Sequence, residues 1–306
     1  MSTFVKTRLA PLAHTAVVTL LLAASCTDPV DIDSAFEEAQ PVVDAWLTDE
    51  SVPQTVFLWQ TQDYFANQAP TPLTGAVVQL TTLADSLPLT FEELSPGAYT
   101  WTPAERGQSL ASFAEAFTLR VEADVAGTQR SYSAASRFRR VPQIDSIAVR
   151  FEEDLIGLDD GLYAQVYARD LPGVGDRYLI RSTINDTLLN RPGELNLAAD
   201  AAFDGGTASD GITLILPIRF GVNKLDDDGA PVALESGDSI SVEIWSLTEE
   251  AFRFLSDAQE QILNADAQLF SVPVVSTRGN VTADGGPEAL GMFSLSRVSR
   301  TGRRVE

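Results

Sequence analysis

Apolar and polar positions alternate over short runs from about residue 42 onward, and turn residues separate the runs. This two-residue period is typical of half-buried β-strands. Strands are predicted at Val42–Thr48, Thr55–Gln60, Gly75–Thr81, Leu87–Glu92, Ala98–Trp101, Ala116–Ala123 and Tyr132–Ser136. Seven short strands within about 95 residues favour an immunoglobulin-like β-sandwich over residues 41–140. The chain has a single cysteine, so this sandwich would lack an internal disulfide.

The same pattern continues beyond Arg140 and predicts a second β-rich domain over residues 141–306. Strands are predicted at Ile144–Phe151, Leu162–Ala168, Tyr178–Ile184, Ile212–Phe220, Ser239–Leu247 and Met292–Val298. Pro217 places the run Ile212–Phe220 at a sheet edge or a bulge, because proline cannot donate a ladder hydrogen bond. The basic residues that follow, Arg300, Arg303 and Arg304, are expected to form a frayed tail.

One segment of the second half has helical rather than strand periodicity. From Thr248 to Asn264, apolar residues recur at spacings of three and four, which predicts an amphipathic helix packed on the second sheet. Thr248 is a suitable N-cap. The helix dipole favours acidic residues in the first turn, where Glu249 and Glu250 stand. The predicted fold class is therefore mainly β with one helix near residues 248–264.

The N-terminal 25 residues have the layout of a bacterial lipoprotein signal peptide. Lys6 and Arg8 precede a short apolar run, Ala16–Ala24, that cannot span a bilayer, and small residues lead directly to Cys26. We expect Cys26 to become the lipid-bearing first residue, acylated with chains such as palmitate that together anchor the protein. The acidic, aperiodic residues 26–40 would then form a tether between the membrane and the fold.

An ordinary cleaved secretory signal that leaves a free thiol is the alternative. Ala23 stands three positions before Cys26, where lipoprotein signals usually have leucine, with Leu22 one step further back. A lone thiol in an exported chain is a reactive liability, however, and acylation removes it. The lipoprotein interpretation predicts a lipid-anchored, surface-exposed protein of the outer membrane.

Composition restricts the chemistry that the chain can perform. The formal charge of −22 becomes more negative once the signal is removed, which argues against nucleic acid as a partner and disfavours anionic ligands over cations or neutral oligomers. The single histidine, His14, lies in the signal segment, so the mature chain has no Ser-His-Asp or Cys-His catalytic set and no His-based or Cys-based metal site. We therefore expect a non-enzymatic protein without a cofactor or metal.

The remaining candidate sites each have an ordinary alternative. Tyr64, Phe65, Asn67 and Gln68 lie in a long polar loop and form a candidate ligand-binding surface, or they fold back onto the domain. The arginines of Arg137–Pro142 could hold a carboxylate or phosphate, or this segment is a solvated linker. Asp226–Gly229 resembles a calcium loop but lacks its alternating acids, so an acidic turn is favoured.

Several runs give the chain a resemblance to the "domain of unknown function 4249" lipoproteins of the Bacteroidetes. They are VVDAWLT, TVFLWQ, TGAVVQL and SPGAYTW in the first half, then PQIDSI, AAFDGG, GDSISVEIWSLTEEAFRFL, FSVPVVSTRGNV and GMFSL. The resemblance covers nearly the whole mature chain, and Ala23 is the departure in the anchoring region. It implies a β-rich, two-domain outer-membrane lipoprotein of a kind often encoded beside TonB-dependent receptors, and it carries over no catalytic residue.

The expected function is that of an accessory or ligand-binding lipoprotein of a TonB-dependent outer-membrane uptake system. Its partners would be the membrane, through the N-terminal lipid, and a β-barrel receptor. A structural or adhesion lipoprotein without a transport role is the alternative, because tethered sandwiches serve both purposes.

Overall fold

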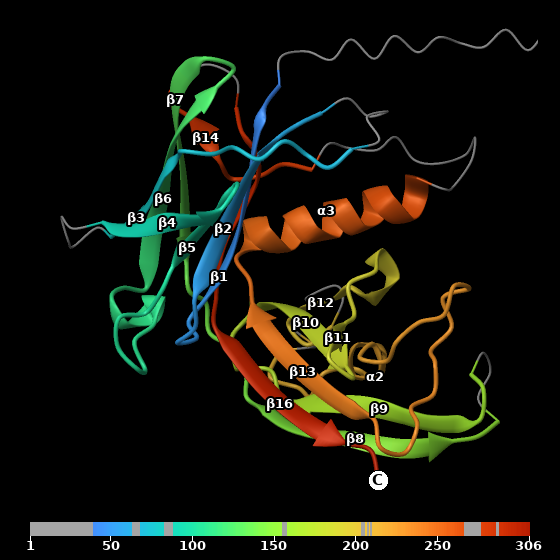
Figure 1. The fold of residues 1–306 in the computed structure, drawn as a ribbon. Coiled ribbons are helices and arrows are strands. Elements are labelled where there is room, and N and C mark those ends of the chain that lie inside the picture. The colour runs from blue at the N-terminus through green and yellow to red at the C-terminus, as the bar shows by residue number, and fades with distance from the viewer. Residues whose placement is uncertain are drawn as a thin grey trace, which may run out of the picture. The chain divides into compact units, whose positions relative to one another are not determined.

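Strand β1 (Pro41–Thr48) shows how directly the sequence pattern becomes structure. Its alternate residues Val43, Ala45 and Leu47 are fully buried, and the residues between them are partly exposed. The computed structural model describes residues 39–306 apart from 63–67, 83–87, 155–157, 203–205, 207, 209, 266–276 and 286–287. These residues belong to one compact unit, Glu38–Glu306. Its strands outweigh its helices, which confirms the mainly β fold class (Figure 1).

The N-terminal half of this unit and a C-terminal segment together build a curled sheet whose described strands number nine, in the order β14-β7-β6-β3-β4-β5-β2-β1-β15. The remaining strands are β2 (Gln54–Gln60), β3 (Val77–Thr81), β4 (Leu89–Ser95), β5 (Ala98–Trp101), β6 (Ala116–Val125), β7 (Thr128–Arg137), β14 (Thr282–Ala283) and β15 (Leu290–Ser296). A 3₁₀ turn, η1 (Leu110–Ser112), precedes β6. A sandwich of two sheets was expected within residues 41–140, whereas these strands form one continuous sheet that also includes β14 and β15.

Strand β15 closes the curl of this sheet. It pairs in parallel with β1, from Val42 opposite Leu290 to Thr48 opposite Ser296. On its other side the Leu295 N–H donates to the Ser136 Oγ on β7 at 3.1 Å. The two edges of the sheet are therefore brought together by a segment from the far end of the chain.

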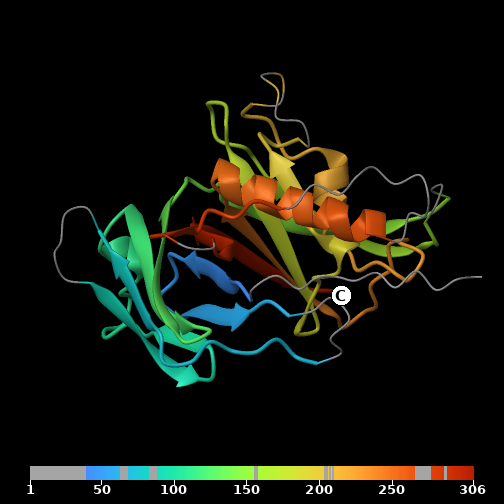
Figure 2. The same cartoon turned by 90° about the horizontal axis from the view of Figure 1, so that it is seen from above.

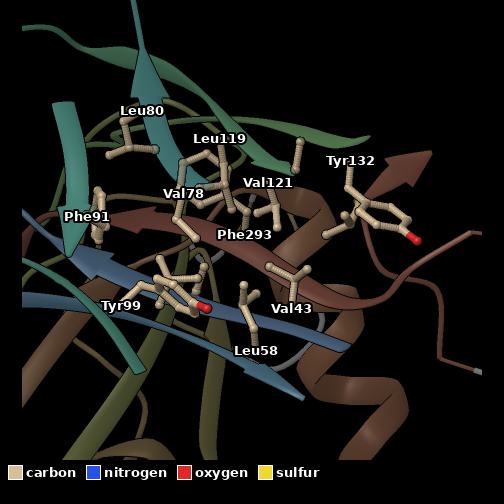
Figure 3. Close-up of a cluster of buried hydrophobic side chains, with 14 of the residues drawn as sticks. Val43, Leu58, Val78, Leu80, Phe91, Tyr99, Leu119, Val121, Tyr132 and Phe293 are labelled. Carbon is tan, nitrogen blue, oxygen red and sulfur yellow. The ribbon is translucent and has the colours of Figure 1, made fainter. Parts of the chain in front are cut away.

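The curl encloses a core to which both halves of the sequence contribute. Figure 3 shows Val43, Leu58, Val78 and Phe293 gathered between the strands, all of them fully buried. Tyr99 is buried too, and its hydroxyl donates to the Leu73 carbonyl at 2.9 Å. Burying each such side chain contributes about 1.5–3 kcal/mol, so this core is the main stabilising element of the curled sheet.

A second sheet follows the connection at Arg140. It contains β10 (Arg177–Ile184), β11 (Thr187–Leu188), β12 (Asn196–Ala199), β13 (Ser239–Ser246) and β16 (Val298–Arg304). The order is β11-β10-β13-β16, with β12 also paired to β10, and the hairpin β8 (Ile144–Glu152) with β9 (Gly161–Ala168) packs beside it. Two short helical turns complete this half: η2 (Pro192–Glu194) and α2 (Leu216–Phe220).

Two predictions for this half are wrong. The run Ile212–Phe220 is not a strand, because Pro217 occupies the first turn of α2, a position that proline favours, and Ile218 points into the second core. The C-terminal arginines do not fray either, because they belong to β16. Arg300 pairs with Glu50 at 3.0 Å and with Glu243 at 2.6 Å, and Arg303 donates to the Ile147 carbonyl.

The predicted helix is confirmed as α3 (Glu249–Ala265). Thr248 caps it as expected: its Oγ1 accepts the Ala251 N–H at 3.2 Å. The helix lies between the curled sheet and the second sheet (Figures 1 and 2). Ala251 is fully buried, and the Phe254 ring lies 6.2 Å from the Trp46 ring of β1. The N-terminus of α3 is thereby held at the seam between the two sheets.

Candidate ligand-binding cleft

An open cleft of about 680 Å³ lies at this seam. Its floor is the outer face of the curled sheet where β3 and β7 end and β6 begins. Its opposite wall is the loop before β10 together with the β13–α3 connection. The floor consists of small side chains from neighbouring strands: Thr81, Ala116, Thr118 and Ala135. Because these side chains are short and face outward, they leave the space that the cleft occupies.

Two arginines form one wall of the cleft. Arg137 is the last residue of β7, and Arg139 follows in the connection to the second sheet. Between them Phe138 points inward and is buried. The alternation of the chain therefore directs both guanidinium groups outward. Within the described part of the chain, neither group has an ion-pair or hydrogen-bond partner, and both side chains are exposed.

The backbone that carries these arginines is held at both sides of Phe138. The Phe138 N–H donates to the Glu115 carbonyl at 2.9 Å. The Ser246 Oγ donates to the Arg139 carbonyl, also at 2.9 Å. The Phe138 ring lies under the Arg297 guanidinium at 5.6 Å. The backbone of the cleft wall is thus held in place, whereas its two guanidinium groups contact no other described charge.

The opposite wall carries charges that are mostly satisfied. Arg177 donates to the Gly175 carbonyl at 3.0 Å and pairs with Glu249 at 3.4 Å. Glu249 also pairs with Arg253 one helical turn further along α3. Glu250, beside it, has no partner among the described residues and is exposed. The five charged side chains that line the cleft are three arginines and two glutamates.

Arg140 fixes the loop that supplies this second wall. Its guanidinium donates to both carboxylate oxygens of Asp176, at 2.9 and 2.5 Å, and to the carbonyls of Pro172 and Gly173. The hydrogen bond to Asp176 raises the pKa of Arg140. Asp200 in turn accepts the backbone N–H of Asp176 at 2.7 Å. Arg140 is therefore a structural residue, unlike its two cleft-lining neighbours.

A family model describes nearly all of the chain that follows Cys26. The "Domain of unknown function (DUF4249)" model matches residues 27–301. The chain belongs to this family. The resemblance inferred from the sequence motifs is thereby confirmed, and no curated protein matches the chain.

The residues proposed from sequence have different outcomes in this DUF4249 protein. Cys26, Tyr64, Phe65 and Asn67 lie outside the described residues, so their proposed roles stay predictions. Gln68 is described and exposed; its carbonyl accepts a hydrogen bond from the Gln62 side chain at 2.7 Å, and it does not line the cleft.

The contacts of two other segments bear on the alternatives left open for them. In Arg137–Pro142, Arg140 holds the carboxylate of Asp176, whereas Arg137 and Arg139 face the cleft, so their binding of an external carboxylate or phosphate stays a prediction. The turn at Asp226–Gly229 is confirmed: the Asp226 carboxylate accepts the N–H groups of Asp228 and Ala230. The alternation Arg-Phe-Arg was the available sequence signal for the cleft wall.

Two negative findings concern the described ranges, residues 39–306 with their gaps. No group of three or more His, Cys, Asp and Glu side chains there is arranged to hold a metal ion. No helix in that part of the chain has the length and apolarity to cross a bilayer.

Proposed function

We propose that this protein is a lipid-anchored binding protein of the cell envelope, which captures a small ligand in the cleft at the seam. The observation that carries the proposal is the cleft itself. Its volume of about 680 Å³ falls within the 300–1,000 Å³ typical of small-molecule sites. Such sites also concentrate where two structural layers meet and combine apolar surface with a few charged groups, as this one does.

The chemistry of the lining favours binding over turnover. The described cleft residues include hydroxyls, an amide, arginines and glutamates but no histidine, cysteine, lysine or tyrosine. Ser136 accepts the Leu295 N–H, so its hydroxyl contributes to sheet closure. A hydroxyl nucleophile needs an adjacent general base, and histidine, the side chain that most often serves as one, is absent from the mature sequence.

The proposed lipid anchor would allow weak binding to a membrane partner to be effective. A lipid on Cys26 followed by the acidic residues up to Gln40 would confine the body to within tens of ångströms of the bilayer. The effective concentration beside a membrane partner would then be high enough for weak contacts to suffice. We propose that this partner is a TonB-dependent β-barrel receptor of the outer membrane, to which the lipoprotein supplies ligand.

Fractionation of a bacterial host that acylates lipoproteins tests the anchoring. The wild-type chain should appear in the outer-membrane fraction with a fatty-acylated N-terminus by mass spectrometry, and Cys26→Ser should leave the membrane. If Cys26→Ser stays in the membrane fraction as strongly as wild type, lipid anchoring at Cys26 is wrong.

A pull-down from solubilised outer membrane tests the partner. Wild type should recover a β-barrel receptor, and deletion of the gene should impair growth on the nutrient which that receptor imports. Recovery of no receptor, together with unchanged growth and reduced cell adhesion, would replace the uptake role with the structural one.

A further inference from the structure

We infer that the cleft binds a small organic oxyanion, a carboxylate or a phosphate ester, through Arg137 and Arg139. This inference rests on the binding function proposed above and names its ligand class. It reverses the expectation, drawn from the net charge alone, that anionic ligands are disfavoured.

Local charge, rather than the total, decides what binds in the cleft. At physiological ionic strength charges separated by more than about 8 Å are largely screened from one another. Most of the acidic surface is therefore too distant to oppose a ligand. At the cleft itself arginines outnumber glutamates by three to two. Glu249 is already paired with Arg177 and Arg253, which leaves Glu250 as the one unpaired acid among the described lining residues.

The two arginines suit an oxyanion better than other ligands. Guanidinium groups present parallel N–H donors that match carboxylate and phosphate oxygens in pairs. In an extended chain, residues two apart lie about 7 Å from each other on the same side, so one small ligand can reach both Arg137 and Arg139. Elsewhere in the described chain many arginines already contact carboxylates, as Arg140, Arg191 and Arg300 do.

The wall is also pre-organised for binding. Hydrogen bonds to Glu115 and from Ser246 fix the backbone on both sides of Phe138. Only the side chains of the two arginines remain to be ordered when a ligand binds, which limits the entropic cost. The floor of alanine and threonine residues offers methyl groups and hydroxyls to the remainder of the ligand.

Titration of the arginine side chains by NMR tests the inference. The sample is the mature chain with Cys26→Ser, and the Nε–H signals are assigned from Arg137→Lys, Arg139→Lys and Arg150→Lys. Arg150 is the matched control because it is exposed, lies on β8 and does not line the cleft. The probes are succinate, glucuronate and glucose 6-phosphate, with neutral glucose for comparison, all at constant ionic strength.

The Arg137 and Arg139 signals should shift saturably with at least one anionic probe, while the Arg150 signal stays in place. The variant Arg137→Ala/Arg139→Ala should bind that probe at least tenfold more weakly, and Arg150→Ala should bind it like wild type. Tighter binding of glucuronate than of glucose 6-phosphate would favour a carboxylate as the ligand group, and the reverse order would favour a phosphate ester.

Three results would overturn the inference. They are the absence of saturable shifts with every anion, equal shifts at Arg150, and unchanged affinity in the double variant. If glucose saturates the cleft signals and the anions do not, the cleft is still a binding site and only the ligand class is wrong.

Discussion

Replacing Gly291 by alanine should disrupt the pairing that closes the curled sheet. Gly291 lies on β15 opposite Val43 of β1, with a φ of +101°. A Cβ built there would stand 2.0 Å from the Val43 carbonyl oxygen and 2.8 Å from the carbonyl carbon. These are backbone atoms in the middle of a strand, so no side-chain rotation can relieve the contact. The two strands must separate.

The loss of folding stability in Gly291→Ala has two parts, and a matched variant isolates one of them. Alanine at positive φ costs about 1–3 kcal/mol, and the forced overlap adds about 1–3 kcal/mol. Gly127 in the β6–β7 hairpin also has a positive φ, +81°, but a Cβ there meets nothing within 4 Å. Gly127→Ala therefore carries the conformational cost without the overlap, and Gly291→Ala should be less stable by the second amount.

Urea unfolding followed by tryptophan fluorescence measures the difference. With a urea dependence of about 3 kcal/mol per M, the midpoint of Gly291→Ala should lie roughly 0.3–1 M below that of Gly127→Ala. If the two variants share one midpoint, or Gly291→Ala matches wild type, β1 and β15 do not pair in this register. The closure of the sheet by the C-terminal segment would then be wrong.

Two further substitutions test the ionic contacts around the seam. Arg140→Ala strands the buried carboxylate of Asp176 and should lower the free energy of unfolding by about 2–3 kcal/mol, less than a fully buried pair because Arg140 is 45% exposed. Arg139→Ala breaks no side-chain contact with a described residue, so it should change the free energy of unfolding by under about 0.5 kcal/mol. Equal losses in the two variants would refute the structural role of Arg140. For Glu194, burial raises the pKa, but hydrogen bonds from the Leu225 and Arg191 N–H groups and from the Arg191 side chain outweigh it and lower the pKa below its ordinary 4.5. The ionised form thus stabilises the fold above pH 4.5 and loses this contribution as the pH falls. Glu194→Gln should cost about 1–3 kcal/mol at pH 7, and urea unfolding at a series of pH values should show the deficit shrinking below pH 4.5; a pH-independent deficit would contradict the assignment.

Local alternation predicted most strands, because burial of one face of a strand leaves a two-residue period of apolar side chains in the sequence. Val43, Ala45 and Leu47 illustrate this. The partner of a strand leaves no such trace. Nothing in GMFSL indicates that it pairs with VVDAWLT some 250 residues earlier, so the one-sheet curl could not be predicted from periodicity. Pro217 was ambiguous for a related reason, since proline suits both a strand edge and a first helical turn.

For a similar reason, the sequence indicated only one of the two walls of the cleft. Arginines at 137 and 139 around Phe138 predict two outward cations, but a solvated linker has the same pattern. Their significance depends on the opposite wall, which Arg177 and Glu250 supply from distant segments. Arg140 shows the converse, because it looks equivalent in sequence yet is bound by Asp176.

The part that distant segments play in the curled sheet leads to a last prediction, about the fragment 39–140. This fragment contains β1 to β7 but lacks β14 and β15. It therefore loses the fully buried Phe293 and Leu295, at about 1.5–3 kcal/mol each, and leaves β1 with an unpaired edge. Losses of that size approach the 5–15 kcal/mol that stabilises a typical domain.

We expect the fragment to be aggregated or poorly folded by gel filtration and near-ultraviolet circular dichroism. Residues 39–306 serve as the control and should be monomeric and cooperative in urea. Adding a segment that spans β14 and β15, joined by a short linker, should restore a folded monomer, because it returns both the missing core residues and the edge partner. If 39–140 alone unfolds cooperatively at the midpoint of the control, the N-terminal half is an autonomous domain. The closing strand would then be an accessory to a fold that is complete without it.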